Sequence, residues 1–213
     1  MSIMLEDKDV CLYFVNRVIN DLKERRIDKK ILLSFLQLPL LDFLREYTRY
    51  EHSRRLLNIA KGSNYSPLEK RLAISLMINI QDLDLNNEIW ACFDNENDFS
   101  VKIAIIYTVM HKRLLDEEEM KRVLQEIDKN KEFYIEQCNF HYGGTFDDTI
   151  RNIEKRLQAE QHQNKRILYI YTLGLMNDKN RKKALEILNN ITPLNDFEQK
   201  IIEESKRCLI NQE

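Results

Sequence analysis

Residues 66–76 read SPLEKRLAISL and residues 97–107 read NDFSVKIAIIY, and the two segments align at a shift of 31 positions. The first segment opens with the residues of a capping box. In this motif the Ser66 side chain accepts the backbone N–H of Glu69, and the Glu69 side chain accepts the backbone N–H of Ser66. Pro67 suits the first helical position. In both segments a basic residue precedes an almost wholly apolar run. These features predict two helices of the same kind at corresponding positions.

A third segment extends this pattern towards the C-terminus. Residues 166–172 read RILYIYT and begin 64 positions after Lys102, close to two further periods. This alignment places a Tyr-Thr pair over the Tyr-Thr pair at 107–108. More amphipathic helices are expected to follow the three copies, over residues 86–93, 116–127 and 181–191. An internal repeat of this kind predicts helix pairs that cover each other's apolar faces.

These segments resemble HEAT-like repeats, in particular the short variety of about thirty residues found in phycobilin-lyase-type HEAT proteins. The resemblance covers residues 66–129 best and residues 163–191 in part. It implies an all-α fold in which antiparallel helix hairpins stack as an α-α superhelix, a HEAT-like solenoid. We expect one α-helical repeat domain over residues 1–213, with 1–62 as an N-terminal helical cap and 63–213 as the repeats. An irregular α-helical domain with chance similarity between apolar helices stays open.

Helices are also predicted outside the best-aligned segments. Residues 10–22 carry apolar side chains at helical spacing. Asp28 is expected to cap a short helix that ends near Pro39. A further helix is expected from about Leu40 to Lys61, where Gly62 would end it in a left-handed conformation.

The remaining helix starts are predicted from capping residues. We place them at Asp98 for a helix through Met110, at Asp116, at Thr145 and at Thr192. In all, about ten helices and no strand are expected.

Composition and charge exclude several classes of protein. The chain is 43% hydrophobic and 32% charged, which excludes a disordered acidic or basic chain. Three prolines and four glycines are too few for an all-β domain with many tight turns. With 33 Lys and Arg against 35 Asp and Glu, the net charge of −2 provides no overall attraction for nucleic acid or an anionic membrane.

The cysteines and the N-terminal residues predict a compartment. The four cysteines form no CxxC pair and lie far apart, at Cys11, Cys92, Cys138 and Cys208. This spacing favours reduced thiols over a disulfide framework. Residues 1–9 carry three acidic residues before any apolar run, unlike a signal peptide. No segment approaches the ~18 apolar residues of a membrane-spanning helix, so we expect a cytoplasmic protein without a membrane partner.

No recognisable motif brings catalytic or metal-binding groups together. Cys138 and His141 form a C-x-x-H pair without a second close pair, so a buried thiol beside a loop histidine is favoured over a metal site. The loop 141–145 is glycine-rich, but Asp147 and Asp148 in the next turn would repel a phosphate. Nucleotide-binding glycine motifs and nucleophile–histidine–acid arrangements are not recognisable. We therefore name no catalytic residue, cofactor or metal, and we favour a function other than catalysis.

Basic residues form the first candidate contact surface. Arg45, Arg49, His52 and Arg55 follow one another at spacings of four, three and three, which puts them along one face of the expected helix 40–61. Such a face can pair with an acidic segment of a neighbouring repeat or stay solvated. It can also bind a protein, or bind nucleic acid with the nearby tyrosines.

Aromatic residues form the second candidate surface and part of the predicted core. His141 and Tyr142 are large residues beside Gly143-Gly144, and together they can protrude as a contact loop. Trp90 is expected to fill the core rather than to anchor an interface. The tyrosines in residues 169–171 are expected mainly to pack between helices.

The predicted architecture favours a non-enzymatic protein-protein interaction module whose partner is another protein. A stacked array presents a rigid surface that needs little ordering on binding, which suits a scaffold, an assembly factor or an immunity protein. We expect a bacterial accessory role for a small cytoplasmic chain of this composition. The alternative is a nucleic-acid-binding protein of the alkylpurine DNA glycosylase type, which resembles HEAT-like stacks. A chromophore-lyase-like enzyme is a further alternative, suggested only by the repeat resemblance.

Overall fold

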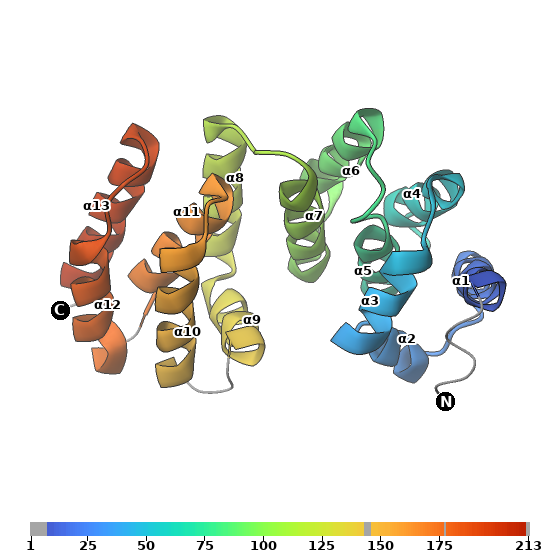
Figure 1. The fold of residues 1–213 in the computed structure, drawn as a ribbon, viewed down its shortest axis with the longest axis horizontal. Helices are drawn as coiled ribbons and strands as arrows, with labels where there is room; N and C mark the ends of the chain where they lie inside the picture. Colours follow the sequence, from blue (N-terminus) through green and yellow to red (C-terminus); the bar gives the residue numbers. More distant parts are fainter. Residues whose placement is uncertain (1–7, 143–145, 177, 212–213) are drawn as a thin grey trace. The chain divides into compact units, whose positions relative to one another are not determined.

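The computed structural model describes residues 8–142, 146–176 and 178–211 (Figure 1). At residues 38, 139–142, 146–148 and 178 it describes the backbone only. The regular structure in these ranges is thirteen α-helices and a short 3-10 helix, with no strand. The predicted all-α class is therefore confirmed. Among the described helices, none is long and apolar enough to cross a membrane.

The chain divides into two compact units, one ending at Arg113 and the other beginning at Leu114. The boundary expected after residue 62 lies inside the first unit. The helices on either side of it, α4 (Ser53–Lys61) and α5 (Pro67–Leu76), pack against each other. Part of the expected N-terminal cap therefore shares a core with the first repeat segment.

The first unit is built around α5. Besides α4 and α5, its described helices are α1 (Lys8–Lys23), α2 (Lys29–Phe35), α3 (Leu38–Tyr47), α6 (Leu83–Asn95) and α7 (Phe99–Lys112). Helix α5 packs against α7, and the Thr108 hydroxyl of α7 lies 3.3 Å from the Ile74 carbonyl oxygen of α5, to which it donates. Leu76 and Ile105 on these two helices are fully buried, as a core position requires.

The second unit is built around α11. Its helices are α8 (Glu117–Lys129), α9 (Lys131–Tyr142), α10 (Phe146–Ala159), α11 (Gln163–Gly174), α12 (Asp178–Asn190) and α13 (Asp196–Ile210). Helix α11 packs against α8, α10, α12 and α13. It lies close to α13 at Gly174, where an added Cβ would lie 2.7 Å from the Ser205 Cβ. Only glycine permits this contact without a shift of one helix.

The predicted packing of the large aromatic residues is confirmed. Trp90 is buried, and its ring stacks on Phe93 with 4.8 Å between the ring centroids. Tyr169 and Tyr171 are each only 8% exposed. These rings fill space between helices.

Local capping predicted several helix starts correctly. Asp28, Ser66, Asp98 and Asp116 each accept backbone N–H groups of the first turn of the helix that follows them. The last helix was placed wrongly, because its N-cap is Asn195 rather than Thr192.

Gly62 ends α4, but it does so for another reason than the one predicted. Its φ of −74° and ψ of 129° are extended rather than left-handed. An added Cβ would lie 2.6 Å from the Tyr65 ring, so the close ring is what favours glycine. The Tyr65 hydroxyl in turn donates to the Lys23 carbonyl oxygen of α1 over 2.9 Å.

The helix predicted from Leu40 to Lys61 is wrong, because it is broken in the structure. Thr48 and Arg49 are extended, with ψ of 130° and 165°, and a 3-10 helix over Tyr50–His52 leads into α4. The break is held by its own hydrogen bonds. The Thr48 hydroxyl donates to the Leu44 carbonyl oxygen at 2.7 Å, and the Arg49 N–H donates to His52 Nδ1 at 2.8 Å.

Candidate functional site

The helix break separates the four basic residues that were predicted to share one helical face. Arg45 lies in α3, Arg49 in the break, His52 in the 3-10 helix and Arg55 in α4. Arg45 Nε donates to the Ser75 carbonyl oxygen of α5 at 3.0 Å. The single face predicted from helical spacing therefore does not form.

His52 is fully buried and joins three segments. Its Nδ1 accepts the Arg49 N–H, and its Nε2 lies 3.1 Å from the Asn16 Oδ1 of α1. Burial, and then the positive charge of Arg55, lowers the pKa of His52. Arg55 donates to the Asn20 Oδ1, also in α1, at 2.8 Å. These contacts are intramolecular, and the partners of His52 and Arg55 are asparagine side chains of α1 rather than an acidic segment.

Neighbouring cations of α4 pair with the acidic helix α6. Arg54 and Lys61 lie 2.9 and 2.7 Å from the two carboxylate oxygens of Glu88. These pairs lower the pKa of Glu88, with the hydrogen bond from Lys61 as the largest cause. Much of the positive charge around α4 is therefore directed at its own unit.

The second predicted surface, at His141 and Tyr142, is described by its backbone at these two residues. Both residues belong to the end of α9 rather than to a loop. Their side chains, and residues 143–145, lie outside the described residues. Cys138, the other half of the C-x-x-H pair, is buried, and burial raises the pKa of its thiol to about 11.

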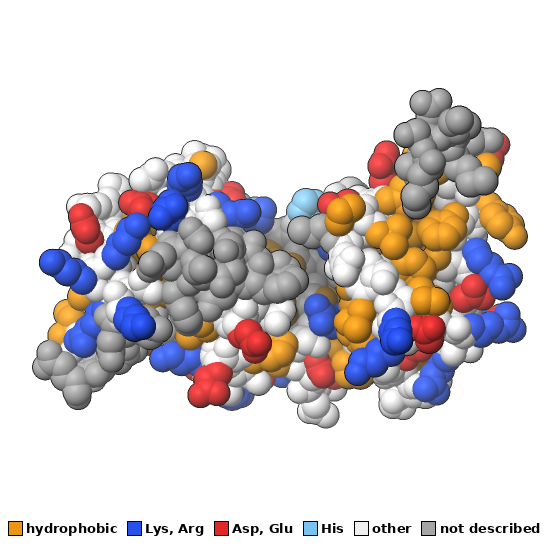
Figure 2. All heavy atoms as spheres, turned by 90° about the horizontal axis from the view of Figure 1, so that it is seen from below, with side chains coloured by type: hydrophobic (Ala, Val, Ile, Leu, Met, Phe, Trp, Pro, Cys, Tyr) orange, Lys and Arg blue, Asp and Glu red, His pale blue; other side chains and the backbone are white. Residues whose placement is uncertain are grey.

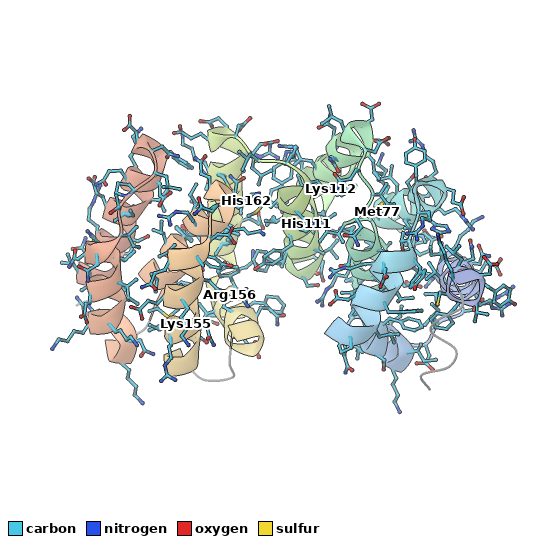
Figure 3. The ribbon with its side chains drawn as sticks, in the orientation of Figure 1. Met77, His111, Lys112, Lys155, Arg156 and His162 are labelled. Atoms are coloured by element: carbon cyan, nitrogen blue, oxygen red, sulfur yellow. The ribbon has the colours of Figure 1, made fainter. Side chains whose placement is uncertain are left out.

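Among the side chains that the structure describes, titratable groups elsewhere do not assemble into a recognisable centre. In the described ranges, no group of three or more His, Cys, Asp or Glu side chains is placed to hold a metal ion. All four cysteines are free, and Cys208 is the exposed one. His111 and Lys112 follow each other at the end of α7 (Figure 3). Burial lowers the pKa of Lys112 to about 8, partly offset by Asp82.

Hollows in the second unit provide a different candidate. Two of them, with volumes of 540 and 330 Å³, share the lining residues Glu117 and Phe197. Because the two hollows adjoin at these residues and are lined by α8, α13 and α11, we describe them together as the α8/α13 groove. Its buried apolar lining consists of Leu115, Met120, Leu124, Tyr171, Phe197 and Ile201.

The edges of the α8/α13 groove are mainly acidic. The charged residues that line it are Asp116, Glu117, Asp128, Asp196 and Glu204, with Lys121 and Lys200. Burial raises the pKa of the Tyr171 hydroxyl well above its usual range, and a hydrogen bond to Asp128 and the charge of Glu204 add to the rise. The Cys208 thiol has a raised pKa for the same kinds of reason. Both lysines line the hollow that contains Asp128 and Glu204, whereas, among the described residues, the hollow at the helix starts is lined by Asp116, Glu117 and Asp196 without a Lys or Arg.

A buried ion pair fixes the floor helix to one wall. Arg166 of α11 donates to Glu198 of α13 with its Nε at 3.1 Å and its second terminal nitrogen at 2.6 Å. It also donates to the carbonyl oxygens of Leu157 and Thr192. Glu198 is fully buried and Arg166 is 8% exposed. This network holds α10, α11 and α13 in one arrangement.

Hydrogen bonds also fix α11 beside the start of the other wall. The Asn164 side chain accepts the Leu115 N–H at 2.9 Å and donates to the Leu115 carbonyl oxygen at 3.0 Å. Leu115 immediately precedes Asp116, the N-cap of α8. The geometry of the groove is therefore held by buried polar contacts at both walls.

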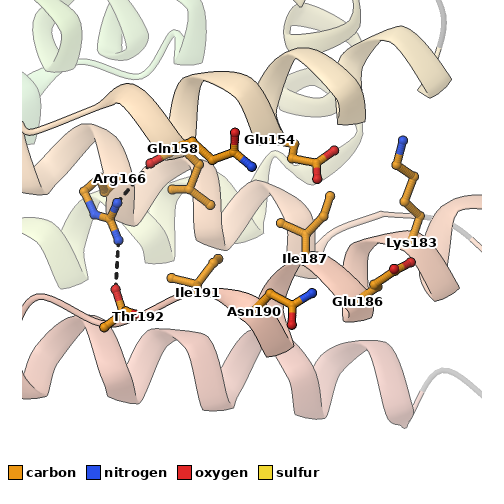
Figure 4. Close-up of a pocket in the computed structure, with 10 residues that line it drawn as sticks. Glu154, Gln158, Arg166, Lys183, Glu186, Ile187, Asn190, Ile191 and Thr192 are labelled. Atoms are coloured by element: carbon orange, nitrogen blue, oxygen red, sulfur yellow. Dashed lines mark hydrogen bonds between the residues drawn. The ribbon is translucent and has the colours of Figure 1, made fainter.

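A third hollow of the second unit lies between α10 and α12 and has a volume of 390 Å³. Figure 4 shows Arg166 at one end of it and Lys183 with Glu186 at the other. Because Arg166 is committed to Glu198 and two carbonyl groups, its charge is not directed to a ligand in this hollow. We interpret Arg166 as a structural residue.

Exposed apolar residues mark a further surface, on the first unit. Figure 2 shows hydrophobic side chains gathered on one face of this unit. The exposed large apolar residues of α1 and α2 are Val10, Tyr13, Phe14, Ile31 and Leu33. The charges around this surface do not favour one class of partner, in contrast to the acidic residues of the α8/α13 groove.

Sequence reasoning missed the α8/α13 groove. Glu117 and Glu204 belong to two acidic stretches of the sequence, residues 117–119 and 203–204. Both stretches are visible in the sequence, but the approach of Glu117 and Glu204 to one groove depends on how α8 and α13 pack on α11. No family model, curated protein or solved structure that was compared with the chain matches it.

Proposed function

We propose that the chain is a protein-interaction module rather than an enzyme. The α8/α13 groove carries this proposal, because it is an elongated surface hollow with an apolar floor and charged edges. Small-molecule sites are typically concave, mainly apolar pockets with a few convergent polar groups. A groove between two helices matches a different mode, in which the apolar face of a partner helix lies between the walls.

The contacts beneath the groove support a rigid binding surface. Helix α11 is buried along most of its length, and Arg166 with Glu198 ties it to α13. The close contact of Gly174 with Ser205 adds a second tie between the same helices. A surface that is already ordered loses little conformational entropy when it binds a partner.

We also propose the HEAT-like repeat for this chain. Supporting it, α5 and α7, which contain the two best-aligned segments, pack against each other. Neighbouring units of a repeat array have the same relation. The four free cysteines support a reducing, cytoplasmic environment. A scaffold, an assembly factor and an immunity protein each remain within the proposal.

Nucleic-acid binding of the alkylpurine DNA glycosylase type is the less supported alternative. Arg45 and Arg55 make hydrogen bonds within the first unit. In the second unit the groove has five carboxylates and two lysines. Carboxylates at these positions repel the phosphates on which nucleic-acid affinity largely depends.

Photo-crosslinking from the groove tests the proposed function. We would place the photoreactive residue p-benzoylphenylalanine at Gln125, which lines the groove and is exposed, and in a control at Gln199, exposed on α13 outside the lining. After irradiation in the native host, we expect a protease-sensitive adduct from position 125 and none from position 199. Nuclease-sensitive adducts, or none at either position, would contradict the proposal.

A further inference from the structure

We propose that the α8/α13 groove receives a cationic amphipathic helix of the partner, with its apolar face on the floor and Lys or Arg side chains at the edges. This inference rests on the proposed function and adds the chemistry of the partner. Two properties of the groove carry it: the charge at its edges and the arrangement of its apolar floor.

Charge at the edges favours a cation. Five carboxylates line the groove against Lys121 and Lys200. Lys121 is already engaged, because its Nζ lies 3.2 Å from Glu117 and 2.8 Å from Glu118. Because Glu117 also lines the groove, this pairing removes one charge of each sign and leaves four lining carboxylates against Lys200, so a basic segment is the complementary ligand.

The acidic groups occur on both walls and near both ends of the groove. Asp116 and Asp196 belong to the hollow at the helix starts, and Asp128 and Glu204 to the hollow farther along α8 and α13. All four are exposed. A partner that carries cations only at one end would leave half of these groups unpaired, so the partner is expected to carry them along its length.

The floor matches the apolar stripe of a helix. Met120 and Leu124 are one turn apart on α8, and Phe197 and Ile201 are one turn apart on α13. Tyr171 of α11 lies in the lining with them. An amphipathic helix presents apolar side chains at three- and four-residue spacing, which matches rows of this kind. At 1.5 Å per residue, a wall of the length of α8 corresponds to about 13 residues of partner helix.

A peptide selection identifies the chemistry directly. The full chain would be used to select from a displayed library of random peptides of about 14 residues, and the enriched peptides would be measured by fluorescence anisotropy. We expect peptides with apolar residues at helical spacing and an excess of Lys and Arg, with affinity that falls as salt rises. Neutral or acidic peptides would overturn the inference.

Matched variants localise the binding. The groove variant Gln125→Lys/Glu204→Lys adds a cation to each wall, and both positions are exposed. The control Gln199→Lys/Glu203→Lys makes the same chemical changes at exposed positions of α13 that do not line the groove. We expect the groove variant to bind about tenfold more weakly and the control to stay within about twofold. Circular dichroism checks that both variants are folded.

The outcomes separate this inference from the proposed function. Equal weakening in both variants, or in neither, would overturn the groove as the cation site. If no cationic peptide is selected while position 125 still crosslinks a protein, the inference fails and the interaction module stands. If both experiments fail, both proposals are wrong. Competition by duplex DNA without binding of cationic peptides would indicate the nucleic-acid alternative and overturn the inference.

Discussion

Replacing Glu198 by glutamine tests the buried ion pair that joins α11 to α13. The Glu198 side chain is fully buried and the Arg166 side chain is 10% exposed. Breaking a buried pair leaves an uncompensated charge and destabilises by about 3 to 5 kcal/mol. Glutamine keeps the volume and one acceptor, and a remaining hydrogen bond recovers about 0.5 to 1.5 kcal/mol. We therefore expect the free energy of unfolding to fall by about 2 to 4 kcal/mol.

The double variant Arg166→Met/Glu198→Leu separates charge from packing. Replacing both partners by apolar residues is often neutral or stabilising by about 1 to 4 kcal/mol. Here the Leu157 carbonyl oxygen also loses the donor that Arg166 provides at 2.9 Å, which costs about 1 to 3 kcal/mol if it stays buried. The two effects nearly offset each other. We expect the double variant to be more stable than Arg166→Met alone and close to the natural protein.

Urea unfolding followed by far-UV circular dichroism measures these differences on the full chain. The control is Lys121→Gln, which removes the exposed pairs with Glu117 and Glu118 and should leave the free energy of unfolding nearly unchanged. A loss below about 1 kcal/mol in Glu198→Gln would show that its charge is not desolvated. A double variant no more stable than Arg166→Met alone would refute the role of the unpaired charge.

Three further predictions test the packing and a buried histidine. Leu76→Ala or Ile105→Ala should each lower the free energy of unfolding by about 2 to 5 kcal/mol, because both side chains are fully buried. Tryptophan fluorescence in urea measures this loss of stability. A loss below about 1 kcal/mol would contradict a core position. Gly174→Ala should lower the free energy of unfolding by about 1 kcal/mol, because overpacking against Ser205 costs about 1 to 3 kcal/mol and the gain in helix propensity is about 1 kcal/mol. Calorimetry measures the difference. A variant more stable than the natural protein would contradict the close contact with Ser205. The pKa of His52 is lower in the folded chain than its ordinary value of 6.5, so the unfolded chain binds the proton first as pH falls. Stability should therefore decrease below about pH 6.5, and His52→Gln should reduce that decrease; an unchanged pH dependence of urea unfolding would assign it to other groups.

The sequence was sufficient where a structural decision is local. At Ser66 and Glu69, two side chains three residues apart exchange hydrogen bonds with each other's backbone N–H groups. Asp98 and Asp116 cap their helices over the same short distance. Because all partners lie within one helical turn, the residue types and their spacing already determine the result.

Prediction was wrong where distant residues compete with local preference. The break at Thr48 and Arg49 interrupts a segment that has helical spacing throughout. It is accompanied by contacts of His52 with Asn16 and of Arg55 with Asn20, both from α1. A local helix preference amounts to tenths of a kcal/mol per residue, so a few tertiary contacts can outweigh it.

By itself the sequence determined that the chain is all-α and where several of its helices begin, because periodicity and capping act within one or two turns. Only the tertiary structure decided that α8 and α13 both pack on α11 and so bring Glu117 and Phe197 into one groove. Such an approach depends on the summed burial of side chains from many positions, with Gly174 and the Arg166–Glu198 pair setting the distance between helices. No short segment of the sequence contains all the residues whose burial determines this packing.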